Sequence, residues 1–261
     1  MDRKNIDKIS QNPEDRMLLA KLWDKINGGM QRNIPANTGF LSPREQDMAR
    51  YLFGEVEGIS SFGGYEDAER RMLLYLPDYC DPDCLWDDDS PVCCLRADFY
   101  QEEALSHRDF LGALIGCGID RSCIGDICVG KGSCDFFVTA EIAAYLLQNF
   151  TSAGRVKLRL KHIPLRNACI PIPEFLEIRD TLASLRLDSV VSSGFRISRS
   201  VSCDAISAGK VAVNALPCEK PDKLICEGTK ISLRGMGKIK LESIGGFSRK
   251  GRISVVIHKY V

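Results

Sequence analysis

The segment that decides the fold of this chain spans residues 186–214 and reads RLDSVVSSGFRISRSVSCDAISAGKVAVN. Apolar residues recur at helical spacing over 185–191, and the glycine at position 194 predicts the end of that helix. Ser198 is a typical N-cap for a second helix over 199–208, because its hydroxyl can accept a hydrogen bond from a free backbone N–H. Residues 210–214 alternate valine with other residues and predict a strand that runs into a turn. The segment therefore predicts two short helices followed by a strand.

Six basic or polar side chains stand at the starts and ends of these predicted elements: Arg186, Arg196, Ser198, Arg199, Lys210 and Asn214. Two small helices packed in an L would bring these positions together on one rim. Guanidinium groups, a lysine and the free N–H groups of a helix start could all face phosphate groups there. The alternative is a set of solvated arginines on a small surface, and the charge pattern by itself does not separate the two.

The chain after this segment predicts a small β-sheet. Residues 230–234 predict a strand, and 238–244 with 252–260 predict a hairpin joined by the glycine-rich basic loop 245–251. Further basic residues along these strands and their loop would extend the basic surface of that rim: Arg234, Lys238, Arg249, Lys250 and Arg252.

The region before the segment has a different order of elements. Strands are predicted at 92–99, 125–138 (a hairpin) and 155–163, with helices that begin after Ser106 and Thr139. The order β-α-β-β-α-β is that of the ferredoxin-like plait, which RNA-recognition modules share with many other proteins. Its last strand predicts one basic face, formed by Arg155, Lys157, Arg159 and Lys161.

The N-terminal region predicts mainly helices. One helix begins at Asn12-Pro13, and a second begins at Ser42 with capping-box spacing. Residues 58–65 predict a turn and 71–76 a strand. We therefore expect an α+β protein with a mainly helical domain over 1–78, a plait over 79–165, and a third domain over 175–261 after a proline-containing linker.

The charge of the chain is zero only in total. There are 35 Lys and Arg against 35 Asp and Glu, but residues 1–154 hold 15 basic and 26 acidic side chains, and residues 155–261 hold 20 and 9. A polyanion partner for the last two-fifths is therefore compatible with the neutral total. The polar N-terminus predicts no signal peptide, and no apolar run is long enough for a membrane span, so we expect a cytoplasmic protein with reduced cysteines.

Catalytic and metal sites find little support in the sequence. Cys80, Cys84, Cys93 and Cys94 depart from the usual zinc spacing, and His107, His162 and His258 are scattered. Phe136 and Phe137 could stack on bases as in RNA-recognition modules, although neighbouring strand residues face opposite ways, so at least one belongs to the core. We expect no metal, no cofactor and no catalytic residue.

The segment 186–214 resembles the S-four-type RNA-binding domain, named for a small-subunit ribosomal protein. The resemblance rests on Arg186-Leu187-Asp188, Phe195-Arg196-Ile197-Ser198-Arg199, Ile206, Gly209-Lys210-Val211 and Val213-Asn214. Glu227-Gly228-Thr229-Lys230-Ile231 matches the later strand of that pattern, with Thr229 in place of the usual Asp.

The whole chain resembles the YlmH family of bacterial and plastid proteins. The motifs are Ser42-Pro43-Arg44-Glu45-Gln46, Phe62-Gly63-Gly64-Tyr65-Glu66-Asp67-Ala68-Glu69-Arg70, Leu111-Gly112-Ala113-Leu114-Ile115-Gly116, Ile124-Gly125-Asp126-Ile127 and Lys250-Gly251-Arg252. The resemblance implies binding to structured ribosomal RNA or tRNA, on the large ribosomal subunit. It also implies a link to ribosome-associated quality control or to division genes.

The residues and the resemblance together predict a monomeric, non-catalytic RNA-binding protein with no membrane partner. The basic and polar residues named above would form its RNA-binding surface, and Arg155, Lys157, Arg159 and Lys161 a secondary one. Two alternatives stay open at this point. The same C-terminal module accompanies pseudouridine synthase and methyltransferase domains, and the acidic N-terminal half could instead bind a basic protein partner.

Overall fold

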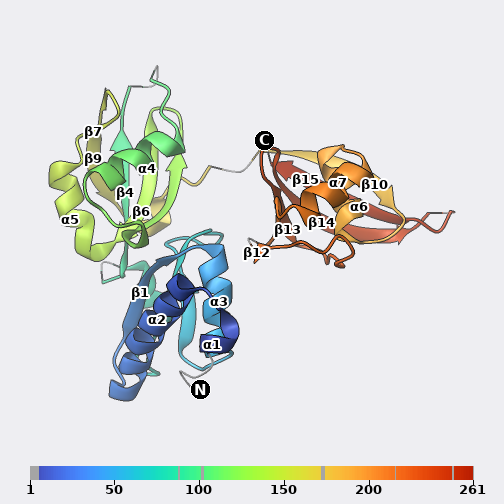
Figure 1. Cartoon of the computed structure of the whole chain (residues 1–261). Coiled ribbons are helices and arrows are strands. Elements are labelled where there is room, and N and C mark those ends of the chain that lie inside the picture. The colour runs from blue at the N-terminus through green and yellow to red at the C-terminus, as the bar shows by residue number, and fades with distance from the viewer. Residues whose placement is uncertain are drawn as a thin grey trace. The chain divides into compact units, whose positions relative to one another are not determined.

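The computed structural model describes residues 6–87, 89–100, 103–171, 174–214, 216–248 and 250–260. The chain forms two compact units, Met1–Pro171 and Ile172–Val261, each with its own secondary structure (Figure 1). The first unit contains the N-terminal elements and the plait, and the second contains the segment 186–214.

The N-terminal elements of the first unit are three helices and a three-stranded antiparallel sheet. Their bounds are α1 Ile6–Ile9, α2 Pro13–Arg32, β1 Ala36–Leu41, α3 Pro43–Phe53, β2 Ile59–Phe62 and β3 Arg71–Tyr75, with sheet order β1-β3-β2. Both predicted helix starts are confirmed: Asn12 caps α2 through its side chain, and Ser42 forms a capping box with Glu45. The predicted turn at 58–65 is wrong in its first half, because residues 59–62 pair with β3 as a strand.

The plait follows with the predicted order of elements. It consists of β4 Val92–Asp98, α4 His107–Gly116, β5 Ile124–Val129, β6 Ser133–Thr139, α5 Ala140–Asn149 and β9 Arg159–Ile163. The sheet order is β5-β6-β4-β9 with every pair antiparallel. Helices α4 and α5 cover one face of this sheet and enclose a core that includes Phe110, Phe136 and Leu146 (Figure 1).

The predicted strand over 155–163 is broken in the structure. A two-stranded hairpin, β7 Ser152–Ala153 with β8 Val156–Lys157, precedes β9, and Leu158 between them is buried. At the break, the backbone N–H of Leu158 donates to the carbonyl of Thr151 at 2.9 Å, which extends the pairing of β7 with β8. The described residues of this unit also form short 3₁₀ helices: η2 Pro82–Trp86, η3 Arg121–Cys123 and η4 Leu165–Asn167.

The second face of the plait sheet is covered by the N-terminal elements. Phe137 on this face is fully buried in a core cluster with Phe40 and Phe62, and its ring contacts Tyr65 at a centroid distance of 5.1 Å. Phe136 is fully buried on the opposite, helical face. The hypothesis that these aromatic rings stack on bases is therefore wrong, since neither ring reaches solvent.

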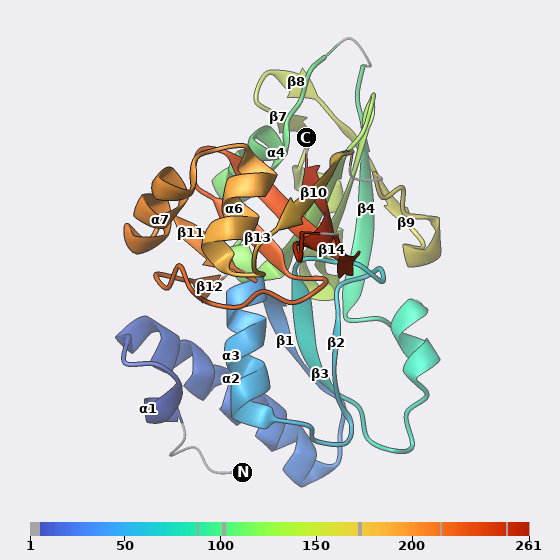
Figure 2. The same cartoon turned by 90° about the vertical axis from the view of Figure 1, so that its right-hand side faces the viewer.

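The second unit is a six-stranded antiparallel sheet with two helices on one face (Figure 2). Its elements are β10 Phe175–Leu182, α6 Leu187–Phe195, α7 Arg199–Ser207, β11 Val211–Val213, β12 Leu216–Pro217, β13 Lys230–Leu233, β14 Gly237–Phe247 and β15 Ile253–Tyr260. The sheet order is β10-β15-β14-β13-β11-β12. The two predicted helices, the strand after them and the C-terminal hairpin are confirmed, whereas β10 has no counterpart in the sequence prediction.

The end of α6 differs from the predicted one for a packing reason. The helix continues past Gly194 to Phe195, and its C-cap residue Arg196 adopts a left-handed backbone with φ of 54°. A Cβ built on Gly194 would lie 2.5 Å from Cδ1 of Ile239, so the glycine allows α6 to pack closely on β14. The glycine that predicts a helix end is therefore a contact position inside the helix.

Candidate nucleic-acid interface

The centre of the candidate interface is a buried aspartate that holds two arginines. The Asp188 carboxylate, on the first turn of α6, is 1% exposed. It accepts hydrogen bonds from Nε and Nη2 of Arg199 at 3.1 and 3.0 Å, and from Nε and Nη2 of Arg186 at 3.3 Å each. The backbone N–H of Ser189 and the thiol of Cys203 donate to it as well. Thus the N-termini of α6 and α7 are joined through one carboxylate.

The charge state of Asp188 follows from these contacts. Burial opposes ionisation, but the hydrogen bonds and charges of Arg186 and Arg199 outweigh it and hold the pKa of Asp188 below its ordinary value. The carboxylate is therefore ionised at neutral pH and fixes both guanidinium planes. The arginine side chains remain 39% and 55% exposed, so part of each stays accessible to a ligand. Two arginines against one carboxylate leave a net positive charge, in a geometry suited to a phosphate.

Arg196 and Ser198 lie between the two helices. The Arg196 side chain is exposed, and the left-handed backbone of this residue closes α6 through bonds from its N–H to the carbonyls of Ser192 and Ser193. The Ser198 hydroxyl accepts a bond from Val201 N at 3.2 Å, as predicted for an N-cap. Its hydroxyl proton stays available to an acceptor on a ligand.

Lys210 and Arg234 form a separate basic pair. The backbone N–H of Arg234 donates to the carbonyl of Lys210 at 3.0 Å, and both side chains are exposed. They lie beyond the C-terminus of α7, a nine-residue helix that spans about 13 Å at ~1.5 Å per residue. The residues predicted to share one rim thus fall into two groups at the two ends of α7.

Asn214 joins the end of β11 to the start of β13 through hydrogen bonds, in addition to any contact with a ligand. Its φ is 48°, and its side-chain oxygen accepts a hydrogen bond from the backbone N–H of Lys230 at 2.9 Å. The backbone N–H of Asn214 donates to the carbonyl of the same lysine at 2.8 Å. This leaves the side-chain NH₂ for a ligand.

The remaining predicted residues of the second unit lie on the C-terminal hairpin. Lys238 is half-buried on β14, opposite Ser232 of β13. Lys250 and Arg252 are exposed in the loop before β15, and the Arg252 guanidinium donates to the carbonyl of Thr181, from Nε at 3.0 Å. Arg249 lies outside the described residues.

The predicted secondary surface belongs to the first unit. Arg155, Lys157, Arg159 and Lys161 are all exposed along the β7–β8 hairpin and β9. Strand β9 is an edge of the plait sheet, and Lys161 pairs there with Asp98 of β4 at 2.6 Å. The four side chains lie on two elements instead of one continuous strand.

The sequence by itself does not predict two features of the interface. Asp188 belongs to a recognisable motif, but only the convergence of two arginines on it shows its role. Lys220 and Lys223 are exposed in a loop whose backbone carbonyls, those of Pro221 and Lys223, accept bonds from the start of α6. These lysines thus lie beside Arg186. Their positions in the sequence do not predict this proximity.

Within the described ranges, no group of three or more His, Cys, Asp or Glu side chains is arranged to hold a metal ion. No described helix is long and apolar enough to cross a membrane.

Two regions of the chain match known protein families, and most of its length matches a known protein. Residues 99–167 match the family model described as "Putative RNA-binding domain in YlmH", and residues 185–231 match the S4 domain. The chain is 33% identical over 225 residues to the ribosome-associated protein quality control protein P2 of Bacillus subtilis (strain 168), a match that covers 85% of this chain and 86% of that protein.

A solved structure also shares the fold. The cell division protein ylmH from Streptococcus pneumoniae superimposes with a TM-score of 0.51 at 21% identity, over 62% of this chain and 98% of that one. The extent of the sequence match, with both domain models in their expected places, shows that this chain belongs to the YlmH family of RNA-binding proteins with a C-terminal S4 domain.

Proposed function

We propose that this protein binds structured RNA, ribosomal RNA or tRNA on the large ribosomal subunit, without catalysing a reaction on it. The observation that carries the proposal is the pair of arginines held at the helix N-termini by Asp188, with exposed guanidinium edges. The name of the Bacillus subtilis relative favours a place in ribosome-associated quality control in the cytoplasm.

The mode of binding follows from the form of RNA. Base edges in the deep major groove of an RNA helix are poorly accessible, so a small basic surface recognises phosphates, 2′-hydroxyls and shape. Arg186 and Arg199 would contact one phosphate, with Arg196 and Ser198 beside it. Lys210 and Arg234 would contact the backbone further along, with Asn214, Lys238, Arg249, Lys250 and Arg252 as additional contacts. Arg155, Lys157, Arg159 and Lys161 would add a second contact surface.

The test begins with crosslinking and sequencing of the RNA bound in cells, which identifies the RNA. In a filter-binding titration with that RNA, Arg199→Glu should weaken affinity at least tenfold, since reversing one phosphate contact costs more than ~1.4 kcal/mol. The matched control is Arg179→Glu, the same charge change at an 80% exposed arginine on β10.

Affinity should also fall steeply with salt. Equal effects of the two variants, or a flat salt response, would contradict the proposal.

A further inference from the structure

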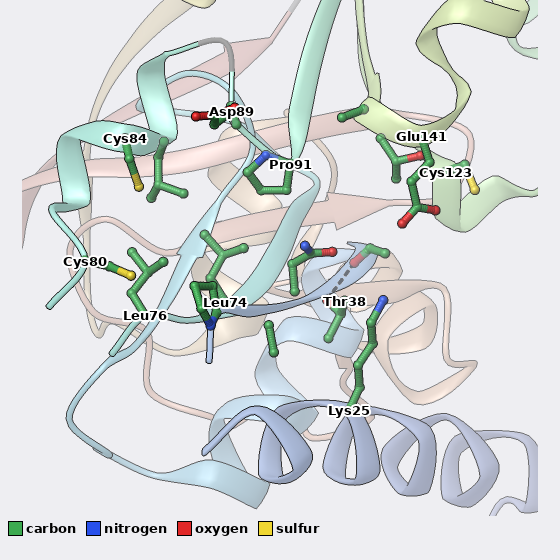
Figure 3. Close-up of a pocket in the computed structure, with 18 of the residues that line it drawn as sticks. Lys25, Thr38, Leu74, Leu76, Cys80, Cys84, Asp89, Pro91, Cys123 and Glu141 are labelled. Carbon is green, nitrogen blue, oxygen red and sulfur yellow. Dashed lines mark hydrogen bonds between the residues drawn. The ribbon is translucent and has the colours of Figure 1, made fainter. Parts of the chain in front are cut away.

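A cavity of about 520 Å³ lies in the first unit (Figure 3). It is enclosed by β1, the end of β3, the segment around η2, η3 and the start of α5. Leu74, Leu76 and Leu85 form an apolar wall, and Asp89 and Glu141 contribute carboxylates. Lys25 reaches toward the cavity from α2 (Figure 3). A space of this size is within the usual range for ligand pockets.

One residue of this cavity carries an unsatisfied polar atom. Thr139 lines it, is 9% exposed and occupies the N-cap position of α5, but makes no side-chain cap hydrogen bond. Its Oγ1 is the one buried side-chain oxygen or nitrogen without a hydrogen-bond partner among the residues that the structure describes. A buried hydroxyl without a partner costs about 1–3 kcal/mol, so a threonine here requires an explanation. A turn of the Thr139 side chain into the cavity would let a polar ligand there provide the missing partner.

The surroundings of the cavity favour a cationic ligand. Residues 78–89 contain six aspartates and no lysine or arginine. Burial raises the pKa of the Cys84 thiol on the cavity wall, and the negative charges of Asp81, Asp87 and Asp89 raise it further. Among the described lining residues Lys25 is the one cation, and it is exposed. An RNA phosphate would meet this negative field unfavourably, whereas an arginine or lysine would be attracted.

We propose that the cavity receives a basic segment of a partner polypeptide. An arginine or lysine side chain would lay its aliphatic stem along Leu74, Leu76 and Leu85, as such side chains do on apolar surfaces. Its charged head would bond to Asp89, a second basic side chain of the segment would bond to Glu141, and Thr139 would accept a hydrogen bond from the segment. This site lies on the acidic unit and shares no residue with the proposed RNA-binding surfaces.

The test uses the full-length protein and fluorescent nonapeptides in an anisotropy titration. One peptide alternates arginine with leucine, and the second replaces each arginine by neutral citrulline. The arginine peptide should bind at least tenfold more tightly, and Glu141→Lys should weaken its binding at least tenfold. Glu55→Lys, at an exposed carboxylate outside the cavity, is the matched control and should have an effect of less than threefold. Glu141→Gln serves if the lysine variant does not fold.

Two further variants distinguish binding in the cavity from binding elsewhere on the protein. Thr139→Val removes a hydroxyl that has no partner in the free protein, so its thermal unfolding midpoint should be unchanged or higher while peptide binding weakens several-fold. Arg199→Glu should leave peptide binding unchanged. The proposal is overturned if the two peptides bind equally or not at all, if Glu55→Lys matches Glu141→Lys, or if a single-stranded RNA decamer displaces the arginine peptide.

Discussion

At the scale of single residues, the interface depends on a carboxylate that never needs to contact the ligand. Asp188 is almost fully buried, and it orients Arg186 and Arg199 from the two helix starts. An arginine side chain loses considerable rotamer freedom when it is held in one geometry. Asp188 imposes that order in the free protein, so binding a phosphate costs less.

The stability contributed by Asp188 should depend on pH. Its pKa is lowered in the folded state, so the ionised form stabilises the fold above the ordinary Asp pKa of about 3.9, and this contribution is lost as pH falls through the lower folded value. Asp188→Asn should lower the free energy of unfolding by about 2 kcal/mol at pH 7. Urea unfolding from pH 7 to pH 3 should show this difference shrinking below pH 4, and a constant difference would refute the assignment.

Arg196 combines an exposed charge with a backbone conformation that costs energy. A non-glycine residue with φ of 54° is less stable there than glycine by about 1 kcal/mol. Arg196→Gly should therefore keep or raise the free energy of unfolding, by up to about 1 kcal/mol, while RNA binding weakens severalfold. Denaturant unfolding and filter binding on the same preparation measure both effects. Lower stability together with unchanged RNA binding would show that the arginine has only a structural role.

At the scale of elements, two of the family motifs join the N-terminal sheet to the plait. The Asp126 carboxylate of β5 accepts hydrogen bonds from the Tyr65 hydroxyl at 2.7 Å and from the backbone N–H groups of Glu69 and Arg70 at 2.6 and 3.0 Å. The Arg70 side chain donates in turn to the carbonyls of Phe40, Arg121 and Ile124. Burial lowers the pKa of this guanidinium to about 10, so the group is still charged at neutral pH. These motifs are therefore explained by the contact between the two sheets.

Gly64 lies against the plait sheet at that contact. Its φ is +95°, and a Cβ there would lie 2.4 Å from the buried Phe137 ring. Gly64→Ala should lower the free energy of unfolding by about 3 kcal/mol, from backbone strain and overpacking together. Gly118→Ala is the matched control, with φ of +81° and no atom within 4 Å, and should cost only about 1 kcal/mol. If denaturant unfolding shows equal losses of unfolding free energy for the two variants, the contact with the Phe137 ring does not restrict the side chain at position 64.

At the scale of the whole molecule, the two units differ in charge and have separate cores. Residues 1–171 hold 20 basic and 26 acidic side chains, and residues 172–261 hold 15 and 9. The core of the second unit, which includes Val190, Ile206 and Ile257, draws all its members from that unit. The four basic residues between 155 and 161 belong to the first unit, so the change in charge along the chain precedes the boundary between the units.

The second unit should fold and bind RNA alone. A fragment of residues 172–261 contains the complete core and both basic pairs, so we expect cooperative thermal unfolding and RNA binding that is weaker than that of the full chain, because the secondary surface is absent, but by no more than tenfold. A fragment that folds but binds more than tenfold more weakly would show that the first unit supplies essential RNA contacts. Replacing Lys157 and Arg159 by Glu in the full chain would then show whether these RNA contacts lie on the secondary surface.

The sequence by itself determined the features that depend on local interactions. Ser42, Ser106 and Ser198 begin helices where capping chemistry predicts them, and the C-terminal hairpin follows from its alternating residues, because a cap or a period needs only neighbouring residues. The sequence does not predict strand β10, because its buried residues Ile178 and Leu182 are four positions apart with the exposed Asp180 between them, a spacing that a helix shares. Pairing with β15 makes this segment a strand.

Contacts between distant residues decided the rest. The burial of Phe137, the packing of Gly194 on Ile239 and the convergence of Arg186 and Arg199 on Asp188 each join separate elements. A pattern of polar and apolar residues shows which side chains can be buried, but not which partner buries them. The family motifs therefore pointed to an RNA-binding protein from the sequence, whereas the paired arginines and the acidic cavity required the tertiary structure.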